Sequence, residues 1–142
     1  MKNKANSPFF LSWAPAIAGM GVLFYFSSLP GNEIHLPLFP HSDKLVHFLA
    51  YLVLGWLIAL RFELRRRLSG PPSPSWAGSA IPFDSKGLSA GMLFGISDEI
   101  HQLFVPLRMF GLGDMAADFL GVAAGYLAYR CMFRNPESRR IR

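Results

Sequence analysis

Hydrophobic residues fall into four long runs separated by polar segments. The run 9–29 contains no charged residue, and the run 45–62 begins directly after Lys44. Two later runs, 87–105 and 115–133, contain charged residues among the apolar ones. The hydrocarbon core of a bilayer is crossed by a helix of about 20 apolar residues. The pattern predicts four membrane-spanning helices, with a two-span protein carrying re-entrant segments as the alternative.

The remaining segments have the composition of connections. Residues 63–86 are basic at first and then rich in Pro, Gly and Ser, which predicts a loop, and the basic tail 134–142 is expected to be disordered. The first run could be a signal peptide, but its length and the lack of an A-x-A site favour a retained anchor. We therefore expect one membrane domain over 1–142, an all-α four-helix bundle.

Composition supports this assignment to the membrane class. The chain has 142 residues, of which 51% are hydrophobic and 16% charged. Its net charge of +5 raises the question of nucleic acid, but the basic residues gather at the ends of the apolar runs. We expect the basic side to meet anionic lipid and expect no nucleic-acid partner. The single cysteine, Cys131, excludes an intrachain disulfide.

The basic residues also indicate an orientation. With four spans, all of the 14 Lys and Arg residues except Lys44 and Arg108 fall on one side. Cytoplasmic loops of membrane proteins carry an excess of Lys and Arg. Both termini are therefore predicted to be cytoplasmic.

The acids and histidines show the opposite bias and gather toward the predicted outer ends of the helices. Asp43, His47 and Tyr51 are four residues apart, so they share a helix face. The expected ligand-binding residues are Asp43, Lys44, His47, Tyr51, Asp98, Glu99, Gln102, Arg108, Asp114 and Asp118. Ionisable residues within spans usually face a bundle interior or a cavity.

Two other interpretations of these residues stay open. Lys44 and Arg108 could neutralise carboxylates in a purely structural network, and Glu33 and Asp114 could be solvated acids at the interface. Gly121 and Gly125 lie on one stripe with the acids of the last run, which predicts close helix packing. No catalytic residue and no metal-ligand set is assigned. No haem, flavin or nucleotide motif is present, so no cofactor is expected.

Three segments carry polar motifs that follow one another in a recognisable order. PHSDKLVHFLAY, residues 40–51, has the form D-K-x-x-H-F-x-x-Y and resembles a signature of the VanZ-like family of membrane proteins. The second block, D-E-x-x-Q followed by P-G-R, corresponds to Asp98, Glu99, Gln102, Pro106 and Arg108, and the last block to Asp114, Asp118, Gly121 and Gly125. The blocks occur in the family's order, and the resemblance covers residues 8 to 130.

Two positions depart from the family pattern. Leu107 stands where the family commonly has Gly, and Asp118 stands where Asn is common. The resemblance implies a small multi-pass protein of the bacterial inner membrane, in a family named after a protein associated with resistance to the glycopeptide teicoplanin. Resistance conferred by this chain does not follow from the resemblance.

Three functions are compatible with these features. The first is binding of a lipid-linked or cell-envelope component at the outer polar site, without catalysis. The second is an accessory subunit of a larger membrane complex. The third is a metal-assisted membrane hydrolase or transferase, in which oxygen and imidazole ligands would come from Asp43, His47, Asp98, Glu99 and Asp118, with His47 or Glu99 as general base.

Overall fold

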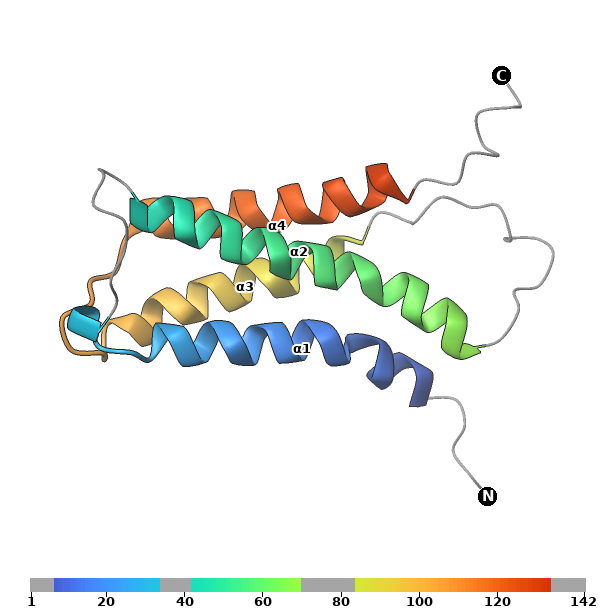
Figure 1. The fold of residues 1–142 in the computed structure, drawn as a ribbon, viewed down its shortest axis with the longest axis horizontal. Helices are drawn as coiled ribbons and strands as arrows, with labels where there is room; N and C mark the ends of the chain where they lie inside the picture. The colour runs from blue at the N-terminus through green and yellow to red at the C-terminus, as the bar shows by residue number, and fades with distance from the viewer. Residues whose placement is uncertain (1–6, 34–41, 70–83, 134–142) are drawn as a thin grey trace.

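The computed structural model describes residues 7–33, 42–69 and 84–133, and this part of the chain is helical without strands. The elements are α1 (Ser7–Ser27), the 3₁₀ helix η1 (Gly31–Glu33), α2 (Ser42–Ser69), α3 (Ser85–Gln102) and α4 (Leu112–Met132). The four long helices lie lengthwise beside one another, and successive helices run in opposite directions (Figure 1). The all-α prediction is confirmed.

The helix α2 is longer than the predicted span. It continues to Ser69, so residues 63–69 of the predicted loop are helical. The Nε of Arg67 donates a 2.8 Å hydrogen bond to Oε1 of Glu63, four residues earlier, and such pairs support a helix surface. Residues 70–83, the predicted disordered tail 134–142, and His35 and His41 lie outside the described residues.

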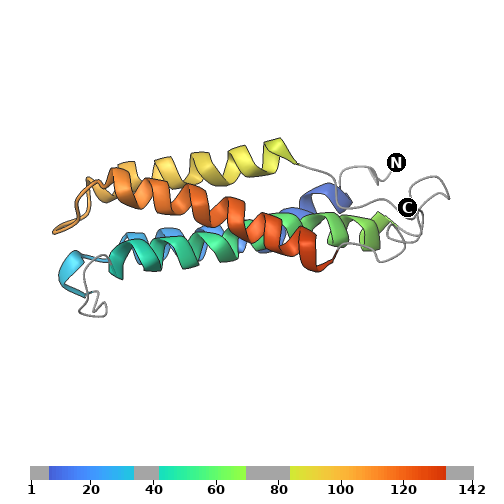
Figure 2. The ribbon, with the colours of Figure 1, turned by 90° about the horizontal axis from the view of Figure 1, so that it is seen from above.

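The helix α2 packs against α1, α3 and α4, and Figure 2 shows α4 lying between α2 and α3. A core cluster of large buried side chains joins α2 to α4 and includes Tyr51, Leu54, Ile58, Val122 and Tyr126. The close packing of these side chains supplies van der Waals contacts between the helices, which stabilise the bundle.

Glycines allow α2 and α4 to approach closely. A Cβ added at Gly121 would lie 2.5 Å from the carbonyl oxygen of Phe48, and one added at Gly125 would overlap the carbonyl oxygen of Leu52. Small residues at a helix interface permit this backbone contact. The α2–α4 contact therefore depends on the lack of a side chain at both positions.

In the described part of the chain, two helices are long and apolar enough to cross a membrane. They are the segments Phe9–Ser27 in α1 and Ser42–Arg65 in α2, with mean hydropathies of 1.6 and 1.9. Large apolar side chains of α1 are exposed, among them Phe10, Ile17 and Tyr25. An apolar surface of this kind suits contact with lipid or with another protein.

The two ends of the bundle differ in their polar residues. At one end α1 and α3 finish and α2 and α4 begin, on the left of Figure 1. We call this the polar end and define it by His47, Asp98, Glu99 and Asp118. We call the opposite end the basic end and define it by Arg61 of α2.

Candidate functional site

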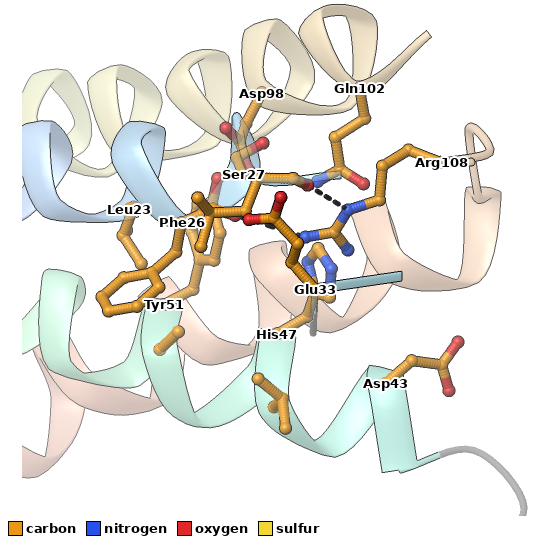
Figure 3. Close-up of a pocket in the computed structure, with 13 residues that line it drawn as sticks. Leu23, Phe26, Ser27, Glu33, Asp43, His47, Tyr51, Asp98, Gln102 and Arg108 are labelled. Atoms are coloured by element: carbon orange, nitrogen blue, oxygen red, sulfur yellow. Dashed lines mark hydrogen bonds between the residues drawn. The ribbon is translucent and has the colours of Figure 1, made fainter. Parts of the chain in front are cut away.

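A cavity of about 320 Å³ opens at the polar end. Its walls come from α1, η1, α2, α3 and the segment after α3 (Figure 3). The lining residues are Leu23, Phe26, Ser27, Leu29, Glu33, Asp43, Val46, His47, Ala50, Tyr51, Asp98, Gln102 and Arg108. The cavity therefore joins apolar side chains of α1 and α2 to polar side chains of α2 and α3.

The helix α2 contributes the residues that its spacing predicted. Asp43, His47 and Tyr51 all line the cavity, as expected for three positions four residues apart on a helix. Tyr51 is buried, and its hydroxyl has no hydrogen-bond partner among the described residues. Its ring lies 6.1 Å from that of Phe94 in α3, centroid to centroid, so Tyr51 connects the cavity to the core.

The helix α3 brings three polar side chains into the interior. Asp98, Glu99 and Gln102 are 3%, 0% and 4% exposed. Asp98 and Gln102 line the cavity, where Figure 3 shows them on the side opposite α2. Oδ1 of Asp98 has no hydrogen-bond partner within the described part of the chain. A buried carboxylate oxygen without a partner is costly, so this arrangement suits a ligand better than it suits stability.

Behind the cavity, three helices meet through His47, Glu99 and Asp118. Nδ1 of His47 lies 2.9 Å from Oδ1 of Asp118 and 3.9 Å from Oε1 of Glu99. The backbone N–H of Gly111 donates to Oε2 of Glu99 at 2.9 Å. Both carboxylates are fully buried. Asp118 is also the position where the resembled pattern has Asn, so this chain carries an additional acid at the contact with His47.

Lys44 forms a separate and more exposed cluster. Its Nζ lies 2.9 Å from Oδ2 of Asp43 and 3.1 Å from Oδ1 of Asp114. Ion pairs exposed to solvent contribute little to stability. Lys44 thus pairs with acids at the margin of the site, and its ion pairs do not include Asp98 or Glu99.

Arg108 does not neutralise the buried acids. Its Nε and one terminal nitrogen each donate a hydrogen bond of 3.3 Å, to the backbone carbonyls of Leu29 and Phe26 respectively (Figure 3). No ion pair within the described residues includes Arg108. Within the described residues Arg108 therefore does not act as the neutralising partner considered from the sequence, because the end of α1 offers it backbone carbonyls.

The segment that carries Arg108 is held by its backbone. The N–H of Gly31 donates to the carbonyl of Pro106 at 3.1 Å, and a Cβ at Gly31 would overlap the carbonyl of Leu107. Leu107 has φ = 61°, a left-handed conformation that favours glycine. This explains why Gly suits the corresponding position of the resembled signature.

His101 belongs to a different contact. Its Nε2 lies 3.0 Å from Oγ of Ser28, and its ring stacks on Phe24 with centroids 4.5 Å apart. His101 therefore faces α1 and is not among the residues that line the cavity.

Sequence reasoning missed the contribution of α1 and η1. Ser27 is buried, its hydroxyl has no hydrogen-bond partner among the residues that the structure describes, and it lines the cavity. Glu33 of η1 also lines the cavity. The polar pair Ser27–Ser28 at the end of an uninterrupted apolar run was the available signal for α1.

Comparison with known families identifies the chain. A family model described as VanZ/LLP1 matches residues 10–134. The chain belongs to the VanZ-like family. No curated protein and no solved structure matches it. The family assignment covers nearly all of the chain, and residues of the three VanZ-like signature blocks meet at the polar end.

Proposed function

We propose that this VanZ-like protein is a multi-pass protein of the bacterial cytoplasmic membrane with both termini in the cytoplasm. The apolar α1 and α2 and the exposed apolar surface of α1 support the membrane location. The orientation rests on the distribution of Lys and Arg. The single cysteine, Cys131, lies exposed near the end of α4 that points to the cytoplasm in this arrangement. Labelling of Cys131 in intact cells by a membrane-impermeant maleimide would contradict the orientation.

In this arrangement the cavity at the polar end binds a lipid-linked or cell-envelope component near the outer face. The observation that carries the proposal is the mixed lining of the cavity. Leu23, Phe26 and Val46 offer apolar surface, whereas Asp98 and Gln102 offer buried polar groups. A ligand with an acyl or prenyl chain and a polar headgroup likewise has an apolar part and a polar part. The volume of about 320 Å³ is in the range of small-molecule sites.

The polar lining indicates the chemistry of the headgroup. Asp98 and Asp43 accept hydrogen bonds, which suits the hydroxyl groups of a saccharide. Two N–H groups of Arg108 donate to backbone carbonyls. The other N–H groups of its guanidinium, which has five in all, can donate to a phosphate or a hydroxyl. We therefore favour a headgroup that combines hydroxyl groups with at most a phosphate linkage.

Native mass spectrometry of the purified chain, extracted with its own lipids and then offered a polyprenyl-phosphate-linked saccharide, tests this function. We expect a retained lipid adduct that Arg108→Ala weakens by about tenfold, the effect of losing one charge-assisted contact. Arg67→Ala is the matched control, because Arg67 is 74% exposed at the basic end. Equal adduct formation by wild type and Arg108→Ala would overturn the proposal, as would co-purification of a stoichiometric protein partner with no lipid bound.

A further inference from the structure

Three side chains from three helices converge beside the cavity. His47 comes from α2, Glu99 from α3 and Asp118 from α4. One ligand atom from each, an imidazole nitrogen and two carboxylate oxygens, lies within 4.8 Å of the other two. The three residues belong to different helices, so this convergence is a product of the packed bundle.

The second observation is that the acids of this cluster have unused oxygens. Oε1 of Glu99 and Oδ2 of Asp118 are buried without a hydrogen-bond partner among the described residues, although both side chains are 0% exposed. Oε2 of Glu99 is occupied by the N–H of Gly111, and its free Oε1 is the atom that approaches Nδ1 of His47 at 3.9 Å. The unpartnered oxygen of Glu99 is thus aimed into the cluster.

The charges at this point are not balanced by side chains of the described residues. Asp98, Glu99 and Asp118 are all buried, and His47 is the basic side chain in contact with this group. Lys44 pairs with Asp43 and Asp114, and Arg108 binds backbone carbonyls. Burying several carboxylates close together without cations is unfavourable. A bound cation would supply the missing charge.

We propose that His47, Glu99 and Asp118 form a binding site for a divalent transition-metal ion such as Zn²⁺ or Mn²⁺. Imidazole suits Zn²⁺ and carboxylates suit Mn²⁺, and both ions accept a mixed set. Ligand atoms that bind one ion at about 2.1 Å lie about 3 to 4 Å apart. The separations of 2.9 and 3.9 Å from Nδ1 of His47 match that range. The proton between His47 and Asp118 leaves when the ion binds, since Nδ1 must offer its lone pair.

The site has a defined relation to the cavity. Of the three ligands, His47 also lines the cavity, so the ion lies next to the space assigned to the headgroup. Three protein ligands leave a coordination position for water or for an oxygen of a bound molecule. The proposal departs from the expectation of no cofactor drawn from the sequence, and it does not depend on the headgroup assignment.

Metal binding to the purified, untagged full chain tests the proposal. The protein is stripped with a chelator in detergent, dialysed in turn against Zn²⁺, Mn²⁺ and Mg²⁺, and its metal content is measured by elemental analysis. We expect one equivalent of Zn²⁺ or Mn²⁺ in the wild type. Asp118→Asn and Glu99→Gln should each weaken binding by at least about tenfold, since even residues that only orient metal ligands have effects of this size.

Glu63→Gln is the matched control, because Glu63 is an acid of α2 that pairs with Arg67 at the basic end, away from the cluster. It should keep the affinity of the wild type. Circular dichroism of each variant separates loss of the site from loss of the fold, and X-ray absorption of the bound metal should show imidazole and carboxylate ligands. Substoichiometric metal in the wild type, or equal affinity in Asp118→Asn, would overturn the proposal. Arg108→Ala should retain the metal, so failure of the headgroup proposal remains distinguishable.

Discussion

The two ends of the bundle treat buried charge in opposite ways. At the basic end, the guanidinium of Arg61 forms an ion pair with Asp84 and lies 4.1 Å from the centre of the Trp13 ring. The N–H of Asp84 also donates to the hydroxyl of Tyr126 at 2.8 Å. At the polar end, Asp98 and Glu99 are more deeply buried, yet each has an oxygen without a partner in the described part of the chain.

The difference separates a contact that stabilises the fold from one that costs stability. A buried ion pair is damaged when one partner is removed, because the other charge stays behind. A buried carboxylate without a partner already carries that cost. Groups that weaken a fold without a compensating contact are typical of binding and catalytic sites. The polar end therefore has the properties of a site, and the basic end has those of a structural clamp.

The largest effect is expected from Asp84→Asn. This change leaves Arg61 about nine-tenths buried without its counter-ion and should lower the free energy of unfolding by about 3 kcal/mol. Asp84 is the N-cap residue of α3, but its side chain makes no capping hydrogen bond, so the loss comes from Arg61. Reversible unfolding in mixed detergent measures the change. A double variant with Arg61→Met should lose less than the two single losses added together; additive losses would show that the pair does not act as a clamp.

An Asp→Asn substitution at the polar end should not lower the free energy of unfolding. In metal-free protein, Asp98→Asn replaces a buried carboxylate, whose Oδ1 has no partner among the described residues, by an amide that is cheaper to bury. We expect no loss of stability, or a gain of about 1 kcal/mol, together with weaker binding of the headgroup ligand. Reversible unfolding in mixed detergent measures this change in the free energy of unfolding. A loss as large as that of Asp84→Asn would remove the distinction between the two ends.

The smallest effect concerns the backbone that carries Arg108. Leu107→Gly relieves a left-handed conformation at an exposed position and should raise the free energy of unfolding by about 1 kcal/mol. Leu103→Gly is the matched control: Leu103 is also exposed, but it has φ = −60°, so glycine there should lower stability. If both glycines change stability in the same direction, the conformation of Leu107 is not a strained feature of the polar end.

The sequence by itself was sufficient for the helices, for the polar residues that the α2 face presents and for the family. These features are local: an apolar run defines a helix, and a spacing of four residues places Asp43, His47 and Tyr51 on one face. The prediction ended this helix at residue 62, whereas α2 continues to Ser69. The error arose because charged residues such as Arg65 and Arg67 lower the hydropathy, although they are part of the helix. Hydropathy reports burial in an apolar environment and does not report where a helix ends.

Only the tertiary structure decided which polar groups meet. Each helix can be rotated about its axis and shifted along it without changing its own sequence pattern, and these freedoms are set by packing. The glycines at Gly121 and Gly125 let α4 approach α2 closely, which brings Asp118 to His47. Docking of η1 on the segment after α3 directs Arg108 to the end of α1 and leaves Glu99 free to face His47. Side-chain contacts between helices are therefore a property of the packed bundle.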